Sequence, residues 1–299
     1  MTSPKPEPTA TARSLLVPAP GERRRQLRSQ VLSGLCLACA VVVLAPLISI
    51  LLYVVGRGIA GLSWSFFTEL PVPVGEAGGG MGNAVLGTLI LIGLACVFGL
   101  PVGILAGIYL AEVGRGRLAG AIRFVADVMS GLPSITIGVF AFTFLVVPMK
   151  RFSALAGGIA LSVVMVPTVV RTTEELLRLV PRNLREASLG LGVSEWRTTV
   201  FVVLRTAGPG IATGVMLAIA RVAGETAPLL FTAFNNRYWS GAIDRPVASL
   251  PVQILTYATS PYAEWQQQAW TGALVLVSLI LVLNLAARWL ASRTRGAAQ

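Results

Sequence analysis

Long apolar runs are the feature that most limits how this chain can fold. Six stretches, each with at most two charged residues, come near the roughly 20 residues that a helix needs to cross a bilayer. They cover residues 31–55, 83–111, 122–148, 153–171, 207–234 and 270–291. Lipid offers no partner to backbone N–H and C=O groups, and a helix satisfies these groups within one segment. The sequence therefore predicts an all-α, polytopic membrane protein with six transmembrane helices.

Basic residues are distributed unevenly between the two ends of these spans. Of the 24 lysines and arginines, 18 fall on the side that holds both termini and 5 on the other, while Arg221 lies within a span. This excess predicts that both termini are cytoplasmic. Orientation thus explains most of the net charge of +11, and we expect membrane lipid, not nucleic acid, as a partner.

The domain organisation is simple. Residues 1–30 are rich in Pro, Thr, Ala and Arg without an apolar period, which predicts a disordered cytoplasmic tail before a transmembrane domain of residues 31–299. Cys36, Cys39 and Cys96 lie in apolar spans, and histidine is absent. We expect no catalytic residue, no metal site and no cofactor. No G-x-x-x-x-G-K-[ST] motif occurs, so the chain should not hydrolyse ATP itself.

The connector of residues 172–206 is too polar to cross a bilayer and far longer than the usual loop of about 4–6 residues. Leu184, Ala187 and Leu191 recur at helical spacing and predict a short helix that Gly190 and Gly192 end. Ser194 is expected to cap a second short helix, whose apolar stripe is Trp196, Val200, Val203 and Leu204. The connector is either a solvated loop or a docking helix for a partner's groove.

Sequence motifs connect this connector to a known family. Glu186, Ala187, Ser188 and Gly192, followed by Val202 and Leu204, resemble the EAA loop of permease subunits in ATP-binding-cassette (ABC) importers, although Arg205 stands where that pattern usually has Pro. Residues 220–233 (ARVAGETAPLLFTA) and 260–267 (SPYAEWQQ) are very similar to the permease of phosphate-specific importers, PstA type. The resemblance covers the chain from about residue 80 onward.

This resemblance implies the type I ABC importer permease fold, a plasma (bacterial inner) membrane location and ATP-driven import of inorganic phosphate by a chain that is not itself an enzyme. The implied partners are a dimer of ATP-binding ATPase subunits, a homologous second permease subunit (PstC type) and an external phosphate-binding protein. The residues expected to couple the permease to the ATPase are Glu186, Ala187, Gly192, Arg185 and Leu191.

Charged residues inside the spans are the candidates for the translocation path. Arg221 lies near the middle of its span, where arginine costs roughly 2.5–3.5 kcal/mol, and Glu225 follows one helical turn later. The two either neutralise each other or line a polar path, in which the arginine fork could bind phosphate. Arg171 is a second path candidate or an interfacial anchor. Asp127 is expected to pair with Arg123 for a structural purpose.

Two glycine patterns suggest local structure. Gly99, Gly103 and Gly107, each four residues apart, predict close helix packing in lipid. The glycine-rich run from Gly75 to Asn83 is expected to be a flexible loop with Asn83 as a helix cap, a phosphate cradle being the weaker alternative. Two rival functions stay open: an ion-coupled secondary carrier of an anion that uses Arg221 and Glu225, and a membrane scaffold that transports nothing.

Overall fold

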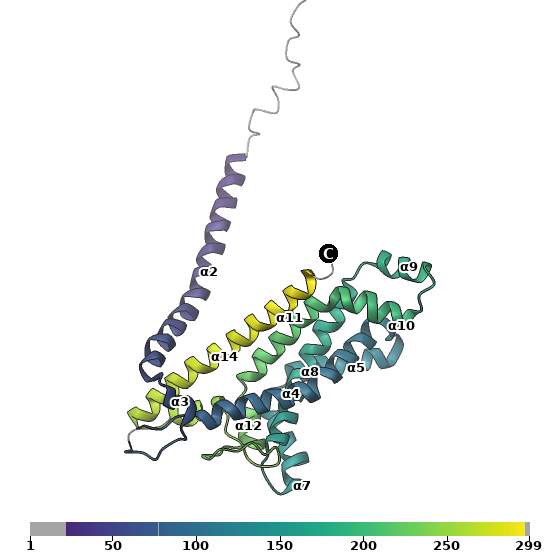
Figure 1. Ribbon diagram of the computed structural model, residues 1–299. Coiled ribbons are helices and arrows are strands. Elements are labelled where there is room, and N and C mark those ends of the chain that lie inside the picture. The colour runs from purple at the N-terminus through teal and green to yellow at the C-terminus, as the bar shows by residue number, and fades with distance from the viewer. Residues whose placement is uncertain (1–21, 77, 297–299) are drawn as a thin grey trace, which may run out of the picture. The chain divides into compact units, whose positions relative to one another are not determined.

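The computed structural model describes residues 22–76 and 78–296, and within those ranges all regular structure is helical (Figure 1). The chain divides into two units, residues 1–53 and 54–299, which are described separately. Most of the expected tail lies outside the described residues. Its last part belongs to helix α2 (Glu22–Gly58), because Glu, Arg, Gln and Leu at 22–28 are good helix formers that extend the apolar span in the N-terminal direction.

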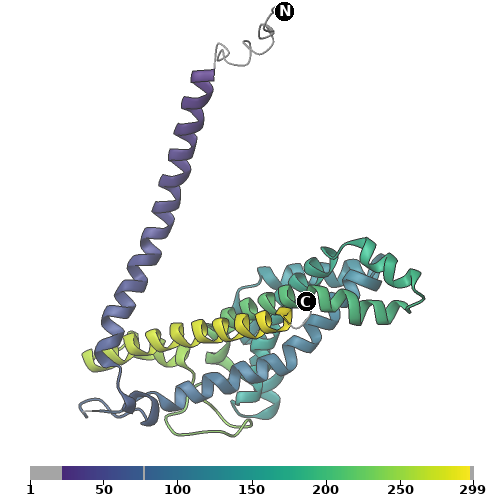
Figure 2. The same cartoon turned by 45° about the horizontal axis from the view of Figure 1, so that its top comes forward.

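Five helical runs in the described ranges are long and apolar enough to cross a membrane, and a bent pair of helices makes up to six. The five are residues 28–61, 82–113, 154–178, 195–223 and 263–286. The prediction of an all-α polytopic protein is confirmed. In the second unit, helix α14 (Ala263–Gly296) runs along the bundle, and the segment that carries helix α9 (Arg182–Gly190) lies at the end remote from helix α3 (Trp64–Thr68), as both views show (Figures 1 and 2).

The centre of the second unit is the packing of helix α4 (Gly82–Ile108) along helix α8 (Ala154–Arg178). A Cβ atom placed on Gly103 would lie 2.7 Å from the Cβ of Val169, and one on Gly107 would lie 2.6 Å from the Cβ of Thr173. The glycine pattern therefore brings the two backbones together, as the sequence predicted. Pro101 lies within α4, which continues to Ile108 and then into a π-helical turn, η2 (Tyr109–Val113).

The expected span 122–148 is bent. Helix α5 (Gly116–Gly131) and helix α6 (Ser134–Ala141), which continues through η3 (Phe142–Val146) into α7 (Val147–Met149), meet at an angle of 105°. Pro133 explains the break, because a proline disfavours the helical conformation in the residue before it, and Leu132 has φ −73° and ψ 136°.

The expected span 207–234 is also interrupted. Helix α11 (Leu204–Ala223) ends at Gly224, and helix α12 (Ala227–Thr232) begins three residues later, with Pro228 in its first turn. The helices that follow the two breaks pack on each other, since a Cβ atom on Gly138 of α6 would be 2.8 Å from the Cα of Pro228 in α12. At its other end, α11 is continuous with α10 (Glu195–Arg197) and η4 (Thr198–Val203). The second connector helix is therefore not separate but the first part of this span.

The end of the bundle remote from α9 is closed by short segments. There, α3 and α13 (Leu250–Ala258) pack against the start of α4, and η1 (Ile59–Gly61) packs against α14. The glycine-rich run donates its N–H groups internally: Gly79 to the Glu69 carboxylate at 3.2 Å, Gly80 to the Leu70 carbonyl at 3.1 Å, and Gly82 to the Glu69 carbonyl at 3.2 Å. These N–H groups are therefore not free to hold phosphate. Asn83 is not a cap; its side chain donates to the Asn236 carbonyl at 2.6 Å.

A pair of glycine substitutions tests the α4–α8 contact. Gly103→Ala should lower the free energy of unfolding by ~1–3 kcal/mol, because its new methyl group overlaps Val169. Gly93→Ala on the same helix meets nothing within 4 Å and should leave stability unchanged or slightly raised. Thermal unfolding of the purified chain in detergent measures both. Equal midpoints for the two variants would contradict the close packing.

Candidate functional site

The connector between α8 and α11 contains one free-standing helix. Helix α8 continues to Arg178, and α9 begins after Pro181, so only residues 179–194 lie outside the two long helical runs. The turn after α9 needs a left-handed residue, which Gly192 supplies with φ +79°. Ser194 occupies the N-cap position of α10, as predicted, but its side chain makes no capping hydrogen bond.

The outer surface of this connector presents apolar side chains to solvent. Leu191 is 85% exposed and Trp196 60%, and Leu184, Leu189 and Phe201 are exposed as well. Glu186, Ala187 and Gly192 are also exposed. A cluster of exposed apolar residues on a polar segment is typical of a surface that binds another protein. The structure thus brings four of the five coupling candidates, Glu186, Ala187, Leu191 and Gly192, to the free surface of one short segment.

Arg185 faces the opposite way, into the bundle. Its guanidinium donates to the Glu112 carboxylate at 2.6 Å and to the Leu177 carbonyl at 2.7 Å. Ser188 is buried on the same side of α9, with its hydroxyl 2.9 Å from that of Thr198. Arg185 therefore holds α9 against η2, just beyond α4, and against the end of α8. It is not part of the exposed surface that Leu191 and its neighbours form.

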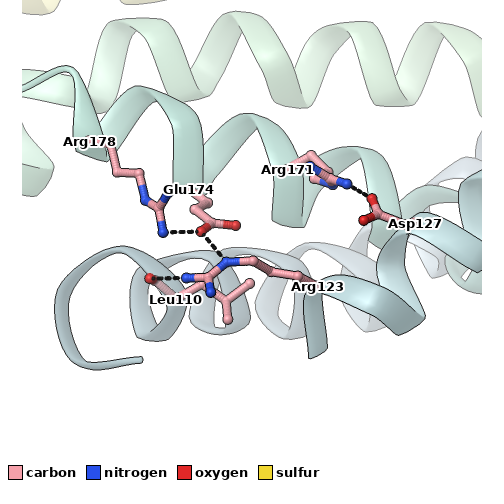
Figure 3. Close-up of polar contacts among 6 residues, drawn as sticks. All are labelled: Leu110, Arg123, Asp127, Arg171, Glu174 and Arg178. Carbon is pink, nitrogen blue, oxygen red and sulfur yellow. Dashed lines mark hydrogen bonds and ion pairs between the residues drawn. The ribbon is translucent and has the colours of Figure 1, made fainter. Parts of the chain in front are cut away.

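A second group of charges joins α5 to α8 (Figure 3). Glu174 is buried and accepts from Arg123 of α5 and from Arg178 of α8, each at 2.7 Å. Arg123 also donates to the Leu110 carbonyl at 3.0 Å, which ties α5 to the π-helical turn η2. The expected ion pair between Arg123 and Asp127 does not form. Asp127 instead pairs with Arg171, the path candidate on α8.

Arg221 and Glu225 do not form the ion pair that their spacing suggested. Helix α11 ends between them, so Glu225 lies in the break before α12 and no longer shares a helical face with Arg221. Arg221 is exposed and Glu225 is partly buried. Within residues 22–76 and 78–296, neither side chain has a hydrogen-bond or ion-pair partner. Arg221 lies in the last turn of α11, next to the break.

The relative depth of the two path candidates follows from helix register. Gly210 of α11 packs against Leu176 of α8, and Gly214 packs against Thr172, so the two helices are antiparallel. At a rise of about 1.5 Å per residue, Arg221 lies roughly 9 Å farther than Arg171 from the α9 end. A cavity of about 610 Å³ lies beside the α8–α11 contact, and neither Arg171 nor Arg221 is among its lining residues. It is lined by α8, α11 and α14 and contains the polar side chains of Thr172, Glu175, Thr213 and Asn284.

Sequence reasoning missed Glu112 and Glu174, the acidic partners on which both ion-pair groups depend. The available signal was their position, because each lies at the end of a long apolar span, where an unpaired carboxylate is costly. No metal-binding group of His, Cys, Asp or Glu occurs among the described residues.

These features are typical of a membrane transport subunit: a helical bundle with charged residues in its spans and a connector with exposed apolar side chains. The fold is similar to that of solved ABC transporters. It aligns with the crystal structure of a bacterial alginate ABC transporter with a TM-score of 0.64 and 14% identity, over 92% of this chain and 98% of that chain. With a structure of the MetNI methionine ABC transporter the TM-score is 0.56 and the identity 20%, over 71% of this chain and 93% of that one.

The chain belongs to the family of binding-protein-dependent transport system inner membrane components, matched over residues 99–296, and within it to the PstA permeases. It is 48% identical to the phosphate transport system permease protein PstA of Yersinia pestis, over 88% of this chain and 90% of that protein. It is 38% identical to PstA 1 of Mycobacterium tuberculosis (strain H37Rv), over 91% of each. The family resemblance in the sequence is thus confirmed.

Membership carries three consequences. The chain is a multi-pass protein of the inner membrane. It is the permease subunit of an ABC transporter, and ATP hydrolysis belongs to a separate chain. Its partners include that ATPase and a binding protein.

Two neighbouring glycines test the coupling turn. Gly192→Ala forces an L-residue into a left-handed conformation, at a cost of about 1–2 kcal/mol, and should weaken attachment of the ATPase up to about tenfold. Gly190→Ala adds the same methyl group at the end of α9, without a left-handed φ and with nothing within 4 Å, and should keep attachment near normal. Co-purification of the ATPase with each variant from detergent is the measurement. Equal recovery would count against a role for this turn.

The Arg185–Glu112 pair can be tested by removing one or both charges. Arg185→Met leaves a largely buried carboxylate unpaired and should destabilise the chain by about 3 kcal/mol. Arg185→Met combined with Glu112→Leu removes both charges and should recover most of that loss. Thermal unfolding in detergent gives the comparison. A double variant less stable than Arg185→Met would show that the pair does not hold α9.

Proposed function

We propose that this chain is the permease subunit through which inorganic phosphate is imported, and that the import is driven by ATP hydrolysis on a separate chain. The observation that carries the proposal is Arg221, an exposed arginine without a partner among the described residues, in the last turn of α11 at the break that interrupts the expected span 207–234. Lipid would not tolerate it, so it faces either a polar path or a second subunit. The phosphate transport permeases to which the chain is similar support the substrate.

Arginine suits this substrate. Phosphate carries one to two negative charges and several acceptor oxygens, and the planar guanidinium binds such a group in a bidentate manner without losing its own charge. Glu225, in the helix break beside Arg221, would limit how tightly the anion is held, and Arg171 offers a second binding position nearer the α9 end. The break also removes the helical pairing that favoured an ion-coupled carrier.

The path is completed by another chain. Arg221 has no partner in the described chain. We therefore assign the side of the translocation path that faces Arg221 to a homologous second permease subunit of the PstC type. The exposed surface of α9 and its turn, with Glu186, Ala187, Leu191 and Gly192, would seat one of two ATPase subunits. Cytoplasmic termini would put this surface on the ATPase side, and an external phosphate-binding protein would deliver the anion at the opposite end.

Substitution of Arg221 tests the path. Arg221→Gln removes the charge and should reduce ATP-dependent phosphate uptake by the vesicle-reconstituted importer about 10- to 100-fold. Arg221→Lys keeps the charge but not the fork and should retain part of the activity. Arg151→Gln, which loses only an exposed pair with Asp244, should stay within about twofold of the unmodified importer. Unchanged uptake by a fully assembled Arg221→Gln importer would remove Arg221 from the path.

A further inference from the structure

We infer that Asp127 is an exchangeable counter-ion of Arg171, which a transported phosphate group displaces on its way through the permease. This inference rests on the proposed function, because it requires Arg171 to lie on the anion's route. It gives Asp127 the role of a carboxylate that occupies Arg171 until phosphate binds there. Asp127 is separate from the ATPase-coupling candidates on α9 and from Arg221 and Glu225.

Figure 3 shows Asp127 and Glu174 at the same α5–α8 interface. The two carboxylates differ in how exposed they are. The side chain of Glu174 is only 5% exposed and has two arginine partners, so an anion in solution cannot reach or replace it. The side chains of Asp127 and Arg171 are 47% and 41% exposed. Half-exposed ion pairs are weak, and a competing anion can therefore separate them.

The Arg171–Asp127 contact also leaves most of the arginine unused. One guanidinium nitrogen of Arg171 contacts one carboxylate oxygen of Asp127, and within the described ranges Arg171 has no other hydrogen bond or ion pair. A guanidinium has five N–H donors, and phosphate offers more acceptor oxygens and more charge than a carboxylate. A phosphate group is therefore the better ligand for the exposed side of Arg171.

The local charge favours exchange over permanent capture. This group of ion pairs contains three positive and two negative side chains and therefore has one surplus positive charge. The positive residues are Arg123, Arg171 and Arg178, and the negative ones are Asp127 and Glu174. The surplus attracts an anion, while the displaced Asp127 remains beside Arg171 on α5 and can take its place again. Its return promotes release of the phosphate, as an importer requires.

The same chemistry would suit the phosphate of a lipid headgroup, so the test separates the two sources. Equilibrium dialysis measures binding of radiolabelled inorganic phosphate to the purified, assembled importer, first in maltoside detergent free of phospholipid and then with added phosphatidylglycerol. Asp127→Asn keeps the shape and removes the competing charge, and Asp127→Glu restores the charge. Glu174→Gln serves as a structural comparison.

Asp127→Asn should bind inorganic phosphate about two- to fivefold more tightly in detergent alone and release it more slowly in single-turnover uptake. Asp127→Glu should return both values toward those of the unmodified importer. In an Arg171→Gln background, Asp127→Asn should have no further effect. Glu174→Gln should lower the unfolding midpoint without tightening phosphate binding.

Three results would overturn the inference: unchanged or weaker binding by Asp127→Asn, an equal change in the Arg171→Gln background, or an effect that appears only with phosphatidylglycerol. Each leaves the proposed function intact if Arg221→Gln still reduces uptake as predicted above. If Arg221→Gln and Arg171→Gln both transport normally, the proposed path itself fails, and the two failures are thus distinguishable.

Discussion

The cost of an unpaired charge within a membrane governs how this chain is organised. Glu174 is buried and forms ion pairs with two arginines, and Glu112 forms an ion pair with Arg185. Asp127 and Arg171 pair with each other while staying half exposed. Arg221 has no partner within the described residues. The carboxylates of Glu112 and Glu174 are therefore held in largely buried ion pairs, whereas the side chains of Asp127, Arg171 and Arg221 remain accessible.

Helix α8 links the connector helix α9 to Arg171. Its last turns hold Arg171, Glu174 and the Leu177 carbonyl, which receives a hydrogen bond from Arg185 of α9. The small residues of α4 lie against the same helix, and Arg185 also contacts Glu112 just beyond α4. Displacement of α9 by an ATPase would therefore act on α4 and α8 together, because ion pairs and close backbone packing resist separate movement.

Apolar runs were enough to predict an all-α membrane protein, and glycine spacing predicted close packing of the helix that carries Gly103, since both depend on local sequence. That α8 is the helix it packs against was not predicted, because this depends on contacts between distant parts of the chain. Of the two alternatives for Arg221 and Glu225, mutual pairing does not occur, because i,i+4 spacing brings side chains together only in an unbroken helix and Gly224 ends α11 between them. The pairing of Arg123 failed for another reason. Its partner Glu174 lies 51 residues away, and the rotation of one helix against another is set by tertiary packing, which the period of a single helix does not contain.

The helix breaks give the bundle two mechanically different parts. Toward α9, ion pairs join α5, α8 and α9 to the end of α4. Toward the other end, α6 and α12 both follow breaks and pack on each other through Gly138 and Pro228. Arg221 lies just before the break in α11. A break lacks the continuous hydrogen bonds that stiffen a helix, so movement between the two parts is easiest at this level. Arg221 therefore lies at the level where such movement would change its surroundings most, while Arg171 and Asp127 belong to the part that ion pairs hold together.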